Sequence, residues 1–316
     1  MSLRVLVVTN MYPDAQNPDH GTFIRDQVEG LRARGYQVDV LLVGGKRRWW
    51  SYLPGTLRLW RQVLTHDYDI LHAHYVFSGI VARTQFRYPL VVSFHGAAEM
   101  EGWTGVLCRL LAPLVDGVAV TSRYHKHDLG YAGAKVIPCG VNLDLFSPGP
   151  QEEARRVLGL PTDRKLVLYV GLLRPEKRVD IIERAVDILR QAGERVQLVV
   201  ASGLPHETIP HYMNACDVLA LASEFEGSPV VVKEAMACNL PIVSVDVGDV
   251  RDLIGNTEGC YICQRDPVDM AAKLRQALAF GRRTDGRERI HHLNVEATID
   301  GVVALYEEAL AKRRQR

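Results

Sequence analysis

Two glutamates near the start of an expected helix are the residues best placed to do chemistry in this chain of 316 residues. Glu226 lies in the loop of SEFEGSPVVVKEAMA, and Glu234 lies within the helix that follows. Ser228 is suited to cap this helix, and Pro229 is suited to its first position. Backbone N–H groups near Val230 would then be unpaired at the positive end of the helix dipole. The segment is therefore a candidate phosphate site.

The two carboxylates extend this interpretation from a phosphate to a nucleotide. Glu234, in the first turns of the helix, can accept hydrogen bonds from both hydroxyls of a ribose, as acidic residues do in other nucleotide folds. Glu226, in the loop, would face whatever is attached beyond the phosphates. The alternative is that both glutamates only interact favourably with the helix dipole.

A second loop carries basic residues between an expected strand and an expected helix, in VGLLRPEKRVD. Arg174, Lys177 and Arg178 are placed there as phosphate-binding cations commonly are. Solvated surface charge is the alternative for such a loop taken alone. Two loops of this kind in one domain favour phosphate binding.

Three histidines lie at or near strand ends. His95 closes the expected strand LVVSFHG and is a candidate for substrate contact. His72 and His74 are two residues apart and therefore share one face of a strand, as metal ligands can. We expect them to pack or to form hydrogen bonds instead, which is the commoner use of strand-end histidines.

The elements that must position these residues alternate along the chain. Short apolar runs are followed by amphipathic stretches of helical period, which is typical of a parallel sheet covered on both faces. The fold class is therefore predicted to be α/β, with doubly wound parallel sheets. Expected strands in the first half are 3–10, 37–43, 69–75, 90–96, 117–122 and 135–141, with the clearest helix at 22–35.

The alternation is interrupted by NLDLFSPGPQEEARR, which reads as a linker, so we place a domain boundary near Pro148. It resumes with expected strands 165–171, 195–202, 217–223 and 241–246 and helices 179–193, 206–216 and 230–238. The predicted domains are 1–148 and 149–294, with a C-terminal helix in 295–316 expected to pack back on the first domain. Two such sheets would leave a cleft, with ligands beyond the carboxyl ends of the strands.

Composition excludes several classes of protein. The 38 Lys and Arg residues against 37 Asp and Glu leave a net charge of +1, so no bulk attraction to nucleic acid is expected. The apolar run at the start is too short for a signal peptide or a membrane span, which favours the cytoplasm. Six cysteines suit a reducing compartment. Cys260 and Cys263 have metal-like spacing in a strand-like segment, but further ligands are missing and no metal is predicted.

One segment is both basic and aromatic, namely GGKRRWWSYLPGTLRLWRQVLTH. It carries five Lys and Arg residues, no acidic residue and three of the four tryptophans. Leu53, Leu57, Trp60 and Leu64 recur at helical spacing within it. An amphipathic helix in 46–64 that lies on an anionic membrane, at its inner face, is one interpretation. A helix that turns this stripe toward the core is the other.

Several of these segments together resemble one family. The following segments occur in the family's order over most of the chain: the two glutamates with seven residues between them, EAMA, GLLRPEK, VIPCGVNLDLF, DILHAHY, SFHG and GTFIRDQVEGLRARGYQVDV. The chain is similar to the retaining, nucleotide-sugar-dependent glycosyltransferases of family four, also described as glycosyl transferases group 1. That resemblance implies a GT-B fold with two Rossmann-like domains, the donor in the second and the acceptor mainly in the first.

The resemblance also implies roles for single residues. Glu234 would bind the ribose hydroxyls, Glu226 the hydroxyls of the donor sugar, and Lys177 the diphosphate. His95 would lie between donor and acceptor. The other positions assigned to donor binding are Gly21, Arg174, Gly227, Ser228, Pro229 and Val230.

The implied reaction is glycosyl transfer with retention, by front-face attack, in which the departing phosphate takes the proton of the acceptor. Cationic side chains and helix amides would stabilise the departing diphosphate, so neither a metal nor another cofactor is expected. The implied partners are a nucleotide-sugar donor and a lipid-linked or saccharide acceptor, as in cell-surface polysaccharide or glycolipid synthesis. A sugar-nucleotide epimerase or hydrolase of the same fold, or a non-catalytic nucleotide-binding module, are the alternatives. VLVVTNMYPDAQ lacks the Gly-x-Gly-x-x-Gly turn of an NAD dehydrogenase.

The sequence departs from the family pattern at three places. Leu172 stands where the family commonly has an arginine, and Arg174 is the substitute candidate. Cys139 stands where the linker motif usually has asparagine. A helix and a strand that usually lie between RVQLVVAS and HETIPHYMNAC are missing, so a smaller second sheet is expected.

Overall fold

The computed structural model describes residues 3–18, 20–44 and 51–315 and divides the chain into two compact units. The first unit runs to Cys139, apart from a short segment after Ala15, and takes up the chain again from Val295. The second unit is Gly140–Asn294 together with that short segment. This division precedes the boundary predicted near Pro148, because Val141 already donates its backbone N–H to the carbonyl of Leu293, 2.9 Å away.

The first unit is built on a parallel sheet of six strands in the order β2-β1-β3-β4-β5-β6. Its strands are β1 (Arg4–Thr9), β2 (Gln37–Leu42), β3 (Ile70–His74), β4 (Leu90–Phe94), β5 (Gly117–Val120) and β6 (Lys135–Val136). Every residue of β3 and β4 is buried, which explains their unbroken apolar runs. The strands predicted for this half are confirmed, although the last one ends at Val136 rather than 141.

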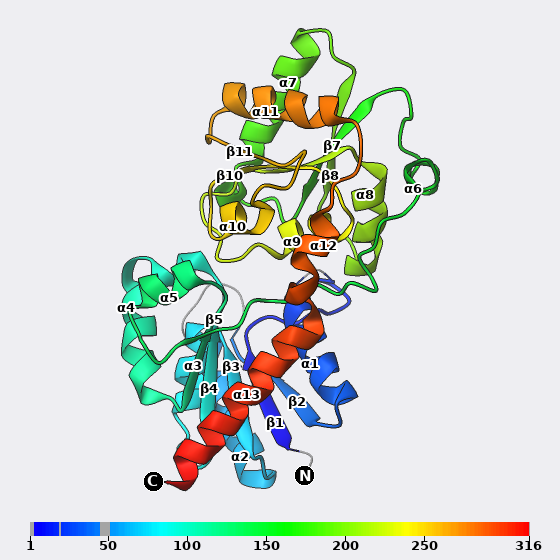
Figure 1. Ribbon diagram of the computed structural model, residues 1–316. Helices are drawn as coiled ribbons and strands as arrows, with labels where there is room; N and C mark the ends of the chain where they lie inside the picture. Colours follow the sequence, from blue (N-terminus) through cyan, green and yellow to red (C-terminus); the bar gives the residue numbers. More distant parts are fainter. Residues whose placement is uncertain (1–2, 19, 45–50, 316) are drawn as a thin grey trace. The chain divides into compact units, whose positions relative to one another are not determined.

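Helices cover both faces of this sheet. α1 (Thr22–Ala33) and α13 (Val295–Arg314) share one hydrophobic cluster, and Figure 1 shows them against the same unit. The opposite face is covered by α2 (Tyr52–Thr65), α3 (Val76–Arg83) and α4 (Gly102–Leu111). Shorter elements are the 3-10 turns η2 (Ala97–Met100) and η3 (Ala112–Leu114) and the helix α5 (Arg123–Leu129).

The C-terminal helix α13 is part of the core of the first unit. Ile299 and Leu305 are almost fully buried, and Leu305 packs against Gly117 of β5. Gly30 of α1 leaves the space that Ile299 fills, since a Cβ there would lie 2.8 Å from its side chain. Arg34 pairs with Asp300 at 2.5 Å across the two helices.

The second unit is built on a parallel sheet of five strands in the order β11-β10-β9-β7-β8. Its strands are β7 (Lys165–Val170), β8 (Val196–Ala201), β9 (Val218–Leu221), β10 (Ile242–Val245) and β11 (Tyr261–Cys263). The expected smaller second sheet is confirmed. The strand-like segment with Cys260 and Cys263 lies at β11. Within the described residues, no three or more side chains are grouped as metal ligands would be.

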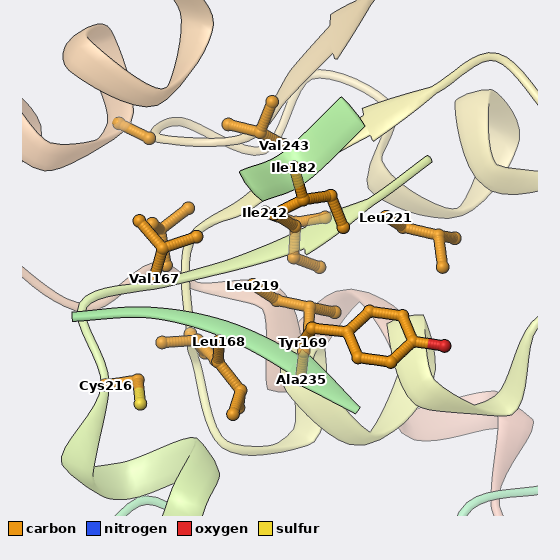
Figure 2. Close-up of a cluster of buried hydrophobic side chains, with 14 of the residues drawn as sticks. Val167, Leu168, Tyr169, Ile182, Cys216, Leu219, Leu221, Ala235, Ile242 and Val243 are labelled. Carbon is orange, nitrogen blue, oxygen red and sulfur yellow. The ribbon is translucent and has the colours of Figure 1, made fainter. Parts of the chain in front are cut away.

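The second sheet also carries helices on both faces and the largest apolar cluster (Figure 2). Contacts place α7 (Val179–Gln191) with α11 (Pro267–Phe280), and α8 (Ile209–Ala215) with α9 (Val230–Ala237). The remaining elements are α6 (Gln151–Leu158), η4 (Pro175–Lys177), η5 (His206–Thr208), α10 (Val250–Ile254), α12 (Gly286–Ile290) and η6 (His291–Leu293). In the described part of the chain, no helix has the length and apolar character needed to cross a bilayer.

The strand orders fix where ligands can bind. In the second sheet β7 lies between β8 and β9. The chain therefore runs from β7 to β8 on one side, and then crosses to β9 on the other side of β7. In the first sheet β1 lies between β2 and β3 in the same way. At such a switch point the loops at the carboxyl ends diverge and leave a crevice for a ligand. The loops after β7 and β9 are therefore the first place to look in the second unit.

The burial of α13 predicts that the first unit depends on it for stability. Leu305→Ala removes a side chain that is 3% exposed and should lower the free energy of unfolding by about 2–5 kcal/mol. Glu307→Ala, at an exposed position of the same helix, is the control and should change it by less than about 0.5 kcal/mol. Urea unfolding followed by circular dichroism measures both, and equal effects would contradict the packing described here.

Candidate functional site

The loops at the switch point of the second sheet bring a cation and a carboxylate together. Lys177 ends the 3-10 turn η4 after β7, and Glu226 lies in the loop after β9. The Lys177 Nζ donates to Glu226 Oε1 at 2.6 Å, and both side chains are more than half buried. The sequence placed these residues in separate motifs, and the fold joins them in one site.

The same two loops are held to each other by backbone and side chain. The N–H of Glu224 donates to the carbonyl of Glu176 at 2.8 Å. Arg178 reaches Glu224 at 3.1 Å and Asp180 at 3.0 Å, and its φ of 49° is unusual for a residue with a side chain. The ion pairs of Arg178 therefore link the two loops. Arg174, in contrast, is exposed at the start of the turn.

Helix α9 begins at Val230, as the predicted range 230–238 has it, but Pro229 does not take the first helical position expected for it. Pro229, with ψ of 117°, is the residue before the helix, and Val230 is its first residue. The sequence predicts Ser228 as the cap of this helix, but Ser228 lies one residue further out, because the extended Pro229 takes the capping position. No side chain caps α9. Since Pro229 has no N–H, the first amides available to an anion are those of Val230 and Val231. Gly227 lies in the loop before them.

Glu234 lies on the fifth residue of α9 and is 5% exposed. Its Oε1 accepts a hydrogen bond from the Nε2–H of His206 at 2.6 Å. His206 begins the turn η5 after β8, and its ring lies 5.2 Å from that of Phe146. Sequence reasoning missed His206, although the deletion after β8 pointed to this loop. The histidine fixes one carboxylate oxygen of Glu234 in place.

Gly248, in the loop after β10, is the second residue that the sequence did not single out. Its φ is +56°, and a Cβ there would lie 2.7 Å from the carbonyl oxygens of both Glu226 and Gly227. A glycine is required because the backbone of one loop rests directly on the other. Gly248 therefore sets the position of the Glu226 loop.

In the first unit, a buried glutamate shapes the loop that carries His95. The carboxylate of Glu99 accepts backbone N–H groups from Val76, His95 and Gly96 at 2.8–3.3 Å. Burial raises the pKa of Glu99 to about 7, and these three N–H groups oppose that rise. Glu99 thus joins the loop after β4 to the start of α3. Gly21, which precedes α1, has φ of 76°, and a Cβ there would make a tight contact of 3.1 Å with the carbonyl oxygen of Met11.

His72 is held in one tautomer by its partners. The amide N–H of Gln27 and the hydroxyl of Tyr306 lie 3.3 and 2.7 Å from His72 Nδ1, and Ser93 Oγ lies 2.7 Å from Nε2. An amide N–H can only donate, so Nδ1 accepts and Nε2–H donates to Ser93. Burial lowers the pKa of His72 to about 3, which keeps the ring neutral. The expectation that this histidine forms hydrogen bonds is confirmed.

His74 in turn orients His95. Their atoms Nδ1 and Nε2 are 2.8 Å apart, and the rings are stacked. The Nε2 of His74 is buried with no partner among the described residues. An unpaired buried N–H is rarer than an unpaired acceptor, so we assign the proton of His74 to Nδ1, from which it donates to His95. His95 is then protonated on Nδ1, which faces the Cys139 sulfur 3.5 Å away. Burial, and then the neighbouring histidines, lower the pKa of His95 to about 3.

The Gly248 contact predicts an unusually costly alanine. Gly248→Ala should lower the free energy of unfolding by about 2–4 kcal/mol, because it adds both backbone strain and a clash with the Glu226 loop. Gly281→Ala is the matched control, since Gly281 has φ of 66° but only an ordinary contact at 3.6 Å. Denaturant titration of both variants separates strain from clash. Equal losses would mean that the loops do not rest on each other.

The histidine pair predicts a tautomer that can be measured without substrate. In ¹⁵N-labelled protein, His95 should be protonated on Nδ1 in the wild type and in His74→Gln, which keeps an N–H donor. In His74→Leu the donor is lost, and the Nε2–H form should dominate. Long-range ¹H–¹⁵N correlation spectra distinguish the two forms. An unchanged His95 tautomer in His74→Leu would contradict the assignment.

Comparison with known proteins agrees with the fold and with the resemblance. Residues 5–145 match the family model described as Glycosyltransferase Family 4, and residues 203–279 match Glycosyl transferases group 1. D-inositol 3-phosphate glycosyltransferase of Thermobifida fusca is 30% identical over 83% of this chain and 75% of its own length. The putative teichuronic acid biosynthesis glycosyltransferase TuaC of Bacillus subtilis is 24% identical over 86% of this chain and 88% of its own.

Solved structures share the same fold. Sucrose-phosphate synthase from Thermosynechococcus elongatus superimposes with a TM-score of 0.83 at 21% identity, covering 99% of this chain and 100% of the other. Anabaena Alr3699/HepE, solved in complex with UDP, gives 0.72 at 17% identity, covering 96% and 99%. The two parallel sheets are thus those of a GT-B fold, as predicted. The chain belongs to the family that these two models describe, Glycosyltransferase Family 4 and Glycosyl transferases group 1, and is a glycosyltransferase.

Proposed function

We propose that this glycosyltransferase moves a sugar from a nucleotide-diphosphate sugar to a hydroxyl acceptor with retention of the anomeric configuration. The observation that carries the proposal is the Lys177–Glu226 pair, 2.6 Å apart, at the switch point of the second sheet beside the start of α9. HepE, which shares the fold, has been solved with UDP and with UDP-glucose, and we therefore favour a UDP-sugar as donor.

In this proposal the cation and the amides act on the departing group. As the bond between the anomeric carbon and the diphosphate breaks, negative charge grows on the phosphate oxygens. Lys177, the exposed Arg174 and the first N–H groups of α9 are the positive groups available to that charge. The acceptor oxygen bonds to the anomeric carbon on the same face, and its proton passes to the departing phosphate. Neither a metal ion nor another cofactor is part of this proposal.

The two glutamates hold the parts of the donor on either side of the phosphates. Glu234 is held by His206 through Oε1, which leaves a pre-oriented carboxylate for the ribose hydroxyls. Glu226 is placed to accept hydrogen bonds from the hydroxyls of the sugar once the diphosphate has drawn Lys177 to itself. The Lys177–Glu226 bond keeps both side chains ordered before the donor binds.

The first unit supplies the acceptor side. His95 is neutral, and its Nδ1–H faces the Cys139 sulfur, a weak acceptor that a substrate oxygen would replace, so His95 would act as a hydrogen-bond donor rather than as a cation. We propose that the acceptor is a lipid-linked or saccharide hydroxyl in cell-surface polysaccharide or glycolipid synthesis. Support comes from the similarity to TuaC, which is named for teichuronic acid biosynthesis.

Calorimetric titration with UDP and with GDP, without added metal, tests the donor site. The wild type should bind one of the two with micromolar affinity, and Glu234→Ala should weaken that binding at least about tenfold, because the ribose hydroxyls lose their acceptor. Glu183→Ala, at an exposed position of α7, is the control and should bind as the wild type does. Binding of neither nucleotide to the wild type would overturn the donor site.

Turnover tests the role of Glu226. With the UDP- or GDP-sugar series selected by the titration, Glu226→Ala should lower kcat at least about a hundredfold while UDP or GDP itself still binds, because Glu226 faces the sugar and not the nucleotide. The anomeric coupling constant of the product, measured by NMR, reports retention or inversion. Wild-type rates in Glu226→Ala, or an inverted product, would contradict the proposal.

A further inference from the structure

Helix α2 of the first unit carries apolar side chains on its outer face as well as on its inner one. Leu59 and Val63 are buried in the core, whereas Leu57 is 72% exposed. The exposed apolar residues of this helix are Leu53, Leu57, Trp60 and Leu64. They form the stripe that the sequence predicts, and it faces outward, so the alternative in which it turns toward the core is wrong. Residues 46–50 of the predicted membrane segment lie outside the described residues.

Helix α4 repeats the pattern. Its inner face buries Cys108 and Leu111. Its outer face exposes Trp103, Val106 and Leu110, spaced three and four residues apart, and Trp103 is 66% exposed. A helix that is apolar on both faces is normally covered on both. This second stripe was not predicted from the sequence.

Aromatic contacts join the two stripes into one surface. The ring of Tyr52, at the start of α2, lies 5.4 Å from that of Phe77 on α3, and Phe77 lies 5.5 Å from Trp103 at the start of α4. Ile80 of α3 is exposed as well, and α3 contacts both α2 and α4. Eight exposed residues make up this surface, the outer apolar face: Leu53, Leu57, Trp60, Leu64, Ile80, Trp103, Val106 and Leu110.

The charges of these three helices have one sign. The segments Tyr52–Thr65, Val76–Arg83 and Gly102–Leu111 contain arginines and no aspartate or glutamate, although the whole chain is nearly neutral. Arg58, Arg61 and Arg109 are exposed, and the fourth arginine is Arg83. The three helices are therefore apolar with a positive margin, and the exposed Glu101 lies directly before α4.

We propose that the outer apolar face binds the surface of an anionic bilayer. Apolar side chains would enter the boundary between headgroups and acyl chains, and the arginines would pair with lipid phosphates. The exposed Trp60 and Trp103 suit such an interface, because a tryptophan has an apolar body and a polar N–H.

Charge argues against a second copy of the chain as the occupant. In a symmetric dimer through this face, the arginines of one copy would approach those of the other, and the three helices offer no carboxylate to pair with them. Anionic lipid headgroups supply the missing negative charge. The proposal rests on this surface and not on the donor site. Its one link to the proposed function is that binding to a bilayer would bring the enzyme to lipid-linked acceptors.

Vesicle co-sedimentation of the full chain tests the proposal, with phosphatidylcholine alone and mixed with phosphatidylglycerol. The wild type should bind the anionic vesicles, and added salt should weaken the binding. Trp103→Ser and Leu57→Ser should each lower the partition coefficient at least about fivefold, since both remove apolar side chains from the bilayer. Val268→Ser, which changes a residue that is 66% exposed in the second unit, is the matched control.

Each outcome has a definite meaning. Loss of vesicle binding in Trp103→Ser with an unchanged control supports the membrane surface. No wild-type binding, or equal binding in all variants, overturns it, and so does a concentration-dependent dimer in light scattering that Trp103→Ser abolishes. Calorimetry with UDP and GDP on the same variants should match the wild type. That readout shows that the variants are folded, and it separates failure of this proposal from failure of the donor site.

Discussion

The position of β7 in the second sheet is the constraint on which the proposed donor site depends. Because β8 lies on one side of β7 and β9 on the other, the loops that follow β7 and β9 meet at the carboxyl edge. The hydrogen bond between Lys177 and Glu226 forms there, although the two residues are 49 positions apart in the sequence. The Gly248 loop supports the Glu226 loop from the neighbouring strand β10. The chemistry thus follows from strand order and from loops that are tied to each other.

In the first unit, three buried histidines are held in place by contacts between residues that are distant in the sequence. His72 accepts a hydrogen bond from Tyr306 of α13 and stacks on His74. His74 in turn forms a hydrogen bond with His95. Burial keeps these rings neutral. The hydrogen bonds of His72, and the bond from His74 to His95, then decide which ring nitrogen carries the proton. The C-terminal helix therefore contributes to the surroundings of His95, although it is distant from it in the sequence.

The amino-acid sequence predicted those features of the protein that depend on local residue patterns. The buried strands, the helices between them and the loops holding Lys177 and Glu226 follow from periodicity and turn residues. Contacts between distant residues could not be read in this way. The bond between His206 and Glu234 depends on how the shortened loop after β8 folds back. Periodicity also revealed the stripe through Leu57 but could not show whether it faces the core or the solvent, because a stripe at helical spacing fits both.

A crystal structure of the protein with the nucleotide selected by calorimetry would test the central claim most directly. The account predicts a diphosphate on the first N–H groups of α9 with Lys177 Nζ at hydrogen-bond distance, and the ribose hydroxyls on Glu234 with His206 still bonded to it. A nucleotide bound elsewhere on the second unit, or one whose ribose does not touch Glu234, would contradict the claim that the switch point of this sheet is the donor site.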